Sequence, residues 1–277
     1  MSGVSTWGAW AGTHPVAVWL CGLALGVGIS WAVRAAAQSA APLYTPWSQR
    51  LPRPSGPAGL AATMAAAALL LWACAHTLAL IAEAWGNPTA WATLDQSLAD
   101  TLRATASVAT LTMFAWLTHM GDTAVLYVLA AVVGALLWWR GYRMLATGWL
   151  VALAGNGVLT RAFKHSFERI RPVHTHEIAV ADGFSFPSGH SSSSLVAYTM
   201  LAYLALRLLP RRWHLPSVMA AAAIIVTVGW SRVVLQVHFA SDVLAGWITG
   251  GAWVTCCLLV MHGATRWRRL RGPAPTP

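Results

Sequence analysis

Seven long apolar stretches constrain this chain more than any other feature of its sequence. They occupy about residues 16–33, 60–82, 123–139, 144–159, 194–209, 215–230 and 243–261. At a rise of about 1.5 Å per residue, most of them are long enough to cross most or all of a hydrocarbon core roughly 30 Å thick. Charged residues make up only 9% of the chain, whereas a soluble domain carries roughly a quarter. The sequence therefore predicts an all-α polytopic integral membrane helical bundle with about six core transmembrane helices and an extra N-terminal span.

The arginines gather at alternate ends of these stretches. They follow the first stretch, separate the third from the fourth and the fifth from the sixth, and follow the last. The acidic residues lie at the other ends, and loops rich in Lys and Arg remain in the cytoplasm. We therefore expect an outside N-terminus, a cytoplasmic C-terminus and extracytoplasmic acidic loops, as in a bacterial inner membrane protein. The net charge of +10 then reflects topology, and nucleic acid is not an expected partner.

Three segments need a more detailed interpretation. The run 104–118 is either a surface or re-entrant helix or a further span, and we interpret it as interfacial because a full span would break the charge alternation. The first stretch is either a signal peptide, since AAAQSA follows it, or a retained anchor. Arg34 directly after it and the lack of positive charge before it favour an anchor. The Pro-rich stretch 50–57 is expected to be a cytoplasmic linker. The predicted units are an N-terminal accessory span with this linker (1–59), a membrane core (60–262) and a basic cytoplasmic tail (263–277).

The small residues inside the apolar stretches favour packing roles. All four cysteines lie in such stretches: Cys21, Cys74, Cys256 and Cys257. Without a paired spacing, they are interpreted as small hydrophobic residues. Gly246 and Gly250 form a GxxxG pair, which serves either a dimer face or close packing inside one bundle. Packing is favoured, so a homodimer has no further support.

Residues 231–242 (SRVVLQVHFASD) interrupt the apolar pattern with polar groups. His238 and Asp242 are one helical turn apart, so their side chains share a face. The carboxylate can accept the Nδ1 proton of the imidazole and leave Nε2 as a nucleophile or base. Arg232 adds a permanent cation whose planar donors suit a phosphate or a carboxylate. An ordinary loop that caps two helices is the alternative for this stretch alone.

Two further polar stretches are expected on the same outer side, namely KHSFERIRP (164–172) and PSGH (187–190). Lys164 is the single lysine of the chain, which favours a site that needs a compact ammonium group over chance survival. Ser188 offers a hydroxyl, Gly189 allows close backbone approach, and the N-terminus of the following helix favours an anion. His190 is then within reach as a proton donor. An ordinary helix N-cap is the alternative for PSGH.

Together, the three stretches supply two guanidinium groups, an ammonium, helix N–H donors, two histidines and a carboxylate. This combination is typical of phosphoryl transfer, in which charge on the equatorial oxygens is held while a nucleophile attacks in line. No acidic cluster is placed to hold a divalent metal, and His174 and His176 are interpreted as solvated loop histidines. We therefore expect a metal-independent reaction that needs no cofactor.

The patterns K-x6-R-P, PSGH and S-R-x5-H-x3-D resemble the three motifs of the type 2 phosphatidic acid phosphatase family, over roughly residues 60–260. This family also includes undecaprenyl pyrophosphate phosphatases, lipid A phosphatases and vanadium haloperoxidases. The resemblance implies that His238 becomes a phosphohistidine, that Asp242 orients it, and that His190 protonates the leaving oxygen and then activates water. It also implies a phosphate-binding set of Lys164, Arg171, Ser188, Gly189 and Arg232. The remaining polar residues near the first motif match no motif position and are interpreted as loop or headgroup contacts: Arg161, Glu168 and Arg169.

The resemblance thus implies a membrane lipid phosphatase with its site on the periplasmic or extracytoplasmic face. Its expected substrates are phosphatidic acid, phosphatidylglycerophosphate or a polyprenyl pyrophosphate, whose tails would remain among the membrane lipids. A lipid A phosphatase or phosphotransferase is the alternative within the family. A protein that binds or transports anionic lipids is the alternative from another class, but the cations gather at one face rather than along a pathway. The apolar spans argue against a soluble haloperoxidase.

Overall fold

The structure is a computed structural model that describes residues 3–50, 56–87, 89–173, 176–179 and 181–270. Within these residues the chain forms helices and no strand, which confirms the all-α prediction. The α-helices are α1 (Gly3–Thr13), α2 (Pro15–Arg50), α3 (Gly56–Gly86), α4 (Ala90–Thr105), α5 (Val108–Thr118), α6 (Thr123–Trp139), α7 (Arg143–Phe167), α8 (Gly189–Leu208), α9 (His214–Val234) and α10 (Ala240–Leu270). Two short 3₁₀ helices accompany them, η1 (His119–Gly121) and η2 (Arg211–Trp213).

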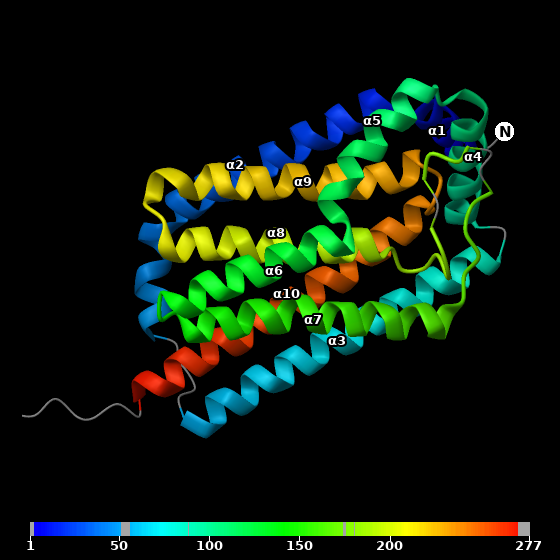
Figure 1. Ribbon diagram of the computed structural model, residues 1–277. Coiled ribbons are helices and arrows are strands. Elements are labelled where there is room, and N and C mark those ends of the chain that lie inside the picture. Colours follow the sequence, from blue (N-terminus) through cyan, green and yellow to red (C-terminus); the bar gives the residue numbers. More distant parts are fainter. Residues whose placement is uncertain (1–2, 51–55, 88, 174–175, 180, 271–277) are drawn as a thin grey trace, which may run out of the picture.

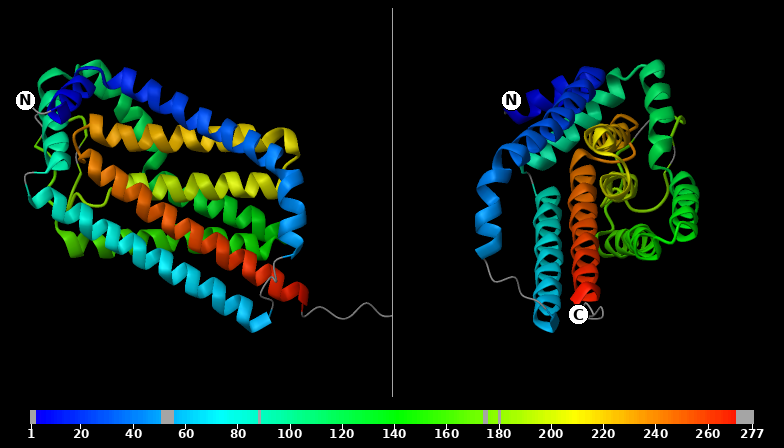
Figure 2. Two further views of the ribbon diagram at one scale, coloured as in Figure 1. Left: turned by 180° about the vertical axis from the view of Figure 1, so that it is seen from behind. Right: turned by 90° about the vertical axis from the view of Figure 1, so that its left-hand side faces the viewer.

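The long helices form one bundle in which the axes of α2, α3 and α6 to α10 are roughly aligned, parallel or antiparallel to one another. Helix α4 lies across one end of this bundle, and α1 packs on α4 (Figures 1 and 2). Among the described residues, five segments are long and apolar enough to cross a membrane: 15–36, 61–85, 108–139, 211–234 and 240–264. They correspond to five of the seven predicted stretches. Helices α7 and α8 contain the other two. They run alongside the rest, but polar residues such as Asn156 and the serines 191–194 make them less apolar.

The stretch 104–118 differs from its prediction as an interfacial helix. Its first residues end α4, and α5 continues through η1 into α6, so that 108–139 forms one candidate span with a break. This arrangement keeps the charge alternation because α5 and α6 together count as a single crossing. Phe114 of α5 is fully buried in a cluster with Val234, Leu235 and Val237. Helix α5 therefore supports the turn that follows α9.

The N-terminal helices pack against the rest of the bundle. Trp19 of α2 donates a hydrogen bond to Thr227 of α9 (3.0 Å), and Trp230 of α9 donates one to the carbonyl of Pro15 (2.8 Å). Helix α1 lies against α4, where Gly8 faces Ser97 and Gly12 faces Thr101. The division near residue 59 stays a prediction, and residues 51–55 of the predicted linker lie outside the described residues. The predicted tail from 263 begins within α10, which continues to Leu270.

Gly246 and Gly250 lie inside the bundle, at the contact between α10 and α8. A Cβ atom on Gly246 would lie 2.6 Å from the carbonyl oxygen of Ser188, and one on Gly250 would lie 2.8 Å from that of Ser192. Both distances are too short for a side chain, so these glycines serve close helix packing, as favoured from the sequence. This contact places the N-terminal turn of α8 beside the second and third turns of α10. All four cysteines are free thiols.

Candidate active site

The three polar motifs meet at the end of the bundle that α4 covers (Figure 1). There α7 and α9 end, α8 and α10 begin, and the segment after α7 passes between them. A cavity of about 480 Å³ opens at this place. Six predicted site residues line it: Lys164, Arg171, Gly189, His190, Arg232 and His238. The structure therefore brings together residues that are up to 74 positions apart in the sequence.

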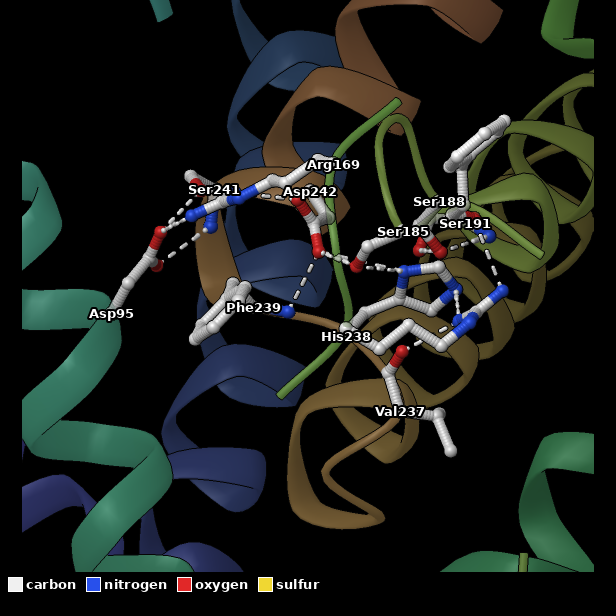
Figure 3. Close-up of polar contacts among 12 residues, drawn as sticks. Asp95, Arg169, Ser185, Ser188, Ser191, Val237, His238, Phe239, Ser241 and Asp242 are labelled. Carbon is white, nitrogen blue, oxygen red and sulfur yellow. Dashed lines mark hydrogen bonds and ion pairs between the residues drawn. The ribbon is translucent and has the colours of Figure 1, made fainter. Parts of the chain in front are cut away.

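His238 and Asp242 flank the start of α10, the first in the turn before it and the second in its first turn. His238 Nδ1 lies 3.5 Å from Asp242 Oδ2, which is longer than an ordinary hydrogen bond. Ser185 joins the two groups: its hydroxyl donates to Asp242 Oδ2 and lies 3.4 Å from His238 Nδ1 (Figure 3). The Phe239 amide also donates to Asp242 Oδ2 (2.8 Å). The carboxylate is thus fixed on the Nδ1 side of the imidazole. Nε2 is therefore the ring nitrogen that is available as a nucleophile or base.

Burial controls the protonation of His238. Its side chain is only 3% exposed, and burial lowers the pKa of the imidazole to about 3, although the Asp242 carboxylate opposes this shift. Two nearby guanidinium groups, those of Arg232 and Arg171, lower the pKa of His238 further. The ring is therefore neutral near pH 7, as a nitrogen nucleophile must be.

Backbone carbonyls hold two cations beside His238. Arg171 donates to the carbonyls of Val237 (2.6 Å), Asp182 (2.9 Å) and Gly183 (3.0 Å), and its Nη1 lies 3.2 Å from His238 Nε2. Lys164 donates to the carbonyl of Phe184. These contacts fix an ammonium and a guanidinium next to the nitrogen that faces the cavity.

Arg232 is a buried cation with an unused donor. Its side chain is 5% exposed, and Nη1 donates to Thr118 Oγ1 at 3.0 Å. Its Nε has no hydrogen-bond partner in the part of the chain that the structure describes. An unsatisfied buried donor is unfavourable by about 1–3 kcal/mol, and more for a charged group. An anion in the cavity would relieve this cost.

Ser188 and Gly189 differ in how they reach the cavity. Ser188 is fully buried as the N-cap of α8, where its Oγ accepts from the amide (3.4 Å) and the hydroxyl (2.9 Å) of Ser191. Its own amide donates to the carbonyl of Asp242 at 3.0 Å. Gly189 lines the cavity, whereas the Ser188 hydroxyl serves the cap. The structure therefore places the Ser188 side chain away from its expected position against a phosphate.

His190 has an acidic partner that sequence reasoning missed. Its Nε2 lies 2.9 Å from Asp122 Oδ1, and the other oxygen of Asp122 lies 2.6 Å from His119 Nδ1. Asp122 follows η1 at the break between α5 and α6. In the sequence it stood out only as one of the acidic residues on the outer side. The break in the helix is what brings this carboxylate to His190.

The interpretation of Arg169 as a loop or headgroup contact was wrong, because its side chain is buried behind the site. It is 9% exposed, and its guanidinium bridges Asp242 Oδ1 (2.6 Å) and Asp95 Oδ2 (3.0 Å) (Figure 3). The rings of Trp85 and Phe239 lie on it, 4.4 and 4.3 Å from the guanidinium carbon. Asp95, in α4, was also missed.

The other residues interpreted as loop contacts lie in different places. Glu168 is exposed and ends α7 with a positive φ of 47°. Arg161 lines the cavity from α7. His176 is half-buried rather than solvated, and His174 lies outside the described residues.

Known proteins share this segment and this bundle. A family model described as the PAP2 superfamily matches residues 145–266, which contain all three motifs. Phosphatidylglycerophosphatase B of Bacillus subtilis (strain 168) is 36% identical over 138 residues, which are 48% of this chain and 66% of that protein, so the match spans just under two thirds of the relative. The crystal structure of a transmembrane PAP2-type phosphatidylglycerolphosphate phosphatase from Bacillus subtilis superposes with a TM-score of 0.58 and 26% identity, over 73% of this chain and 98% of that one. With its motifs gathered inside the matched segment of an all-α membrane bundle, this chain is similar to proteins of the PAP2 superfamily over residues 145–266.

Proposed function

We propose that this protein is an integral membrane lipid phosphatase that removes a terminal phosphate through a phosphohistidine. One observation carries the proposal: a neutral His238, backed by a buried carboxylate, faces a cavity lined by Arg232, whose Nε has no hydrogen-bond partner among the described residues. A site that only bound or transported anionic lipids would need the cations. It would not need an oriented, neutral imidazole among them.

The first chemical step forms the phosphoenzyme. The lone pair of His238 Nε2 attacks phosphorus, and the bond between phosphorus and the leaving oxygen breaks. The ring becomes cationic, and Asp242 stabilises it on the Nδ1 side. His190 in its protonated form donates a proton to the leaving oxygen, so that the lipid departs as a neutral hydroxyl or as a lipid phosphate. Burial lowers the pKa of His190 to about 4, and Asp122, 2.9 Å away, opposes this shift and favours the protonated imidazole that this step requires.

The second step releases phosphate. His190, now neutral, takes a proton from a water molecule as the water oxygen attacks phosphorus. The bond from phosphorus to Nε2 breaks and its electron pair returns to His238. Inorganic phosphate leaves, and both histidines regain their starting protonation states. During each step Lys164, Arg171, Arg232 and the first amides of α8 would hold the equatorial oxygens, where one such donor contributes about 10²–10³ in rate.

The cavity also accounts for a lipid substrate. Away from the cations, its lining becomes apolar between α6, α7 and α8, with Leu126, Leu153 and Val196. Tyr127, also in the lining, is 67% exposed, so the lining extends to the outer surface of α6. A lipid could therefore place its phosphate at His238 while its tail stays in the bilayer. Phosphatidylglycerophosphate, the substrate in the relatives' names, joins phosphatidic acid and polyprenyl pyrophosphate as a candidate.

Phosphate release from a lipid panel tests this proposal. The purified protein in detergent should release phosphate from at least one of these lipids in the presence of EDTA, since the proposed chemistry uses only groups of the protein itself. His238→Ala should abolish release, whereas His262→Ala, exposed near the opposite end of α10, should not. A well-folded protein that binds these lipids but hydrolyses none would contradict the proposal and support a binding or transport role.

A further inference from the structure

The face of α7 that lines the cavity changes character along its length. From the apolar part outward, it presents Leu153, Asn156, Gly157, Thr160, Arg161 and Lys164. Spacings of three and four residues place these positions on one helix face. At a rise of about 1.5 Å per residue, Thr160 and Arg161 lie one turn, roughly 4.5–6 Å, below Lys164 towards the apolar part. They occupy the boundary between the catalytic cations and the apolar lining.

The polar groups at this boundary have no partner within the described part of the chain. Thr160 is 6% exposed, yet its hydroxyl makes no hydrogen bond, although a helical threonine commonly bonds to the carbonyl four residues earlier. The guanidinium of Arg161 is exposed, and no ion pair or hydrogen bond with a described residue holds it. The wall beside them is hollow, because a Cβ atom on Gly157 would meet nothing within 4 Å. Unused donors beside open space indicate a place for an acceptor.

This boundary also lies where the leaving group must pass. The methyl carbon of Thr160 is 3.7 Å from the position of a Cβ atom on Gly189. The next residue, His190, is the proposed proton donor to the leaving oxygen. Whatever is attached to that oxygen therefore passes Thr160 and Arg161 before it reaches the apolar lining around Leu153.

We propose that Arg161 and Thr160 form a second phosphate subsite, which takes an ionised phosphate located between the scissile phosphate and the lipid tail. This inference rests on the proposed function and narrows its substrate class to lipids with two phosphates in series. The second phosphate is either the inner one of a prenyl diphosphate or the diester of a phosphatidylglycerophosphate. A guanidinium pairs with such a phosphate through two parallel hydrogen bonds, and the Thr160 hydroxyl donates a third. Phosphatidic acid, with one phosphate, leaves the subsite empty.

A binding measurement tests the subsite independently of turnover. In a His238→Ala background, the affinities for farnesyl methylenediphosphonate and farnesyl monophosphonate are measured by tryptophan fluorescence. We expect the diphosphonate to bind more tightly. Arg161→Gln should weaken its binding about tenfold to a hundredfold, as for a lost hydrogen bond to a charged group, while leaving the monophosphonate unaffected. Thr160→Val, which preserves the shape, should act in the same direction, and Arg161→Lys should lie between. Arg140→Ala, exposed at the other end of the bundle, should change neither affinity.

Turnover then distinguishes the two sources of the second phosphate. In the protein with His238 intact, a loss of kcat/KM in Arg161→Gln for farnesyl diphosphate alone identifies a diphosphate, and a loss for phosphatidylglycerophosphate alone identifies the diester. Equal losses for one-phosphate and two-phosphate ligands, or no loss in binding, would overturn the subsite. If no lipid is hydrolysed but the diphosphonate preference depends on Arg161, the subsite stands and the phosphatase proposal fails.

Discussion

The guanidinium of Arg169 lies 2.6 Å from Oδ1 of Asp242, while the other oxygen of that carboxylate faces His238. Asp95 holds the far side of the same guanidinium and also accepts from the amide of Ser241 at 3.0 Å. The carboxylate behind the proposed nucleophile is therefore fixed from both sides. Its support reaches α4, a helix that lies across the end of the bundle (Figure 3).

This arrangement predicts that Asp95 positions the nucleophile without touching substrate. Asp95→Asn keeps the contact between Arg169 and Asp242 but removes the charge that anchors Arg169. We expect kcat to fall while KM changes little, and we expect slower phosphoenzyme formation in rapid-quench experiments. Arg169→Met should be far more disruptive, since removing one partner of a buried ion pair typically destabilises by about 3–5 kcal/mol. If folded Asp95→Asn protein keeps its full kcat, the network is structural only.

The roles of the two histidines predict different trapped states. With a lipid phosphate labelled in its terminal phosphate, acid-labile and base-stable label should appear on the wild-type protein and not on folded His238→Ala. His190→Ala should still accumulate label from a substrate with a good leaving group, because its first task is to protonate the leaving oxygen. Label retained by His238→Ala would place the nucleophile elsewhere.

The depressed pKa of His238 predicts a ring that stays neutral in acid. Because the folded pKa is about 3 and that of the unfolded chain about 6.5, the unfolded state binds a proton that the folded state does not between these values. This group therefore lowers stability as the pH falls below about 6.5 and has no such effect above it. In ¹⁵N-histidine spectra, the His238 resonances are identified as those that the His238→Asn protein lacks. In the wild-type protein they should keep the chemical shifts of a neutral imidazole down to about pH 5. A titration midpoint near 6.5 would contradict the burial of this ring.

The contact between α10 and α8 predicts a contrast between two glycines. Gly246→Ala forces a methyl group onto the Ser188 carbonyl and should destabilise by about 1–3 kcal/mol, as overpacking does. It should also reduce kcat, because this contact positions the start of α8. Gly251→Ala is the matched control, since its Cβ atom meets nothing within 4 Å. Equal melting temperatures for both variants would show that the helices separate readily.

The sequence was sufficient for the parts of the site that lie in local patterns. Spacing along the chain predicted that Asp242 would back His238, and apolar length predicted the bundle. Asp95, Asp122 and Ser185 were missed because their contacts join segments 146, 68 and 57 residues apart, for which no local pattern exists. The broken span of α5 and α6 was missed for another reason. The charged residues alternate in the same way whether α5 and α6 form one broken crossing or α5 is a surface helix and α6 alone crosses, so charge does not distinguish the two arrangements.

The final prediction concerns the face of the membrane on which the site lies. The site is at one end of the bundle, and Arg140, Arg143, Arg211 and Arg212 are at the other (Figures 1 and 2). Loops rich in arginine remain in the cytoplasm, so we expect the cavity to open on the extracytoplasmic side. The test replaces Cys21 with Ala, since the other native thiols are buried, and adds Val173→Cys or Arg212→Cys at exposed positions. In spheroplasts, an impermeant maleimide should label the cysteine at 173 directly and the one at 212 only after lysis. Labelling of both from one side would contradict a bundle that crosses the membrane, and the reverse pattern would place the site, and the lipids it acts on, in the cytoplasmic leaflet.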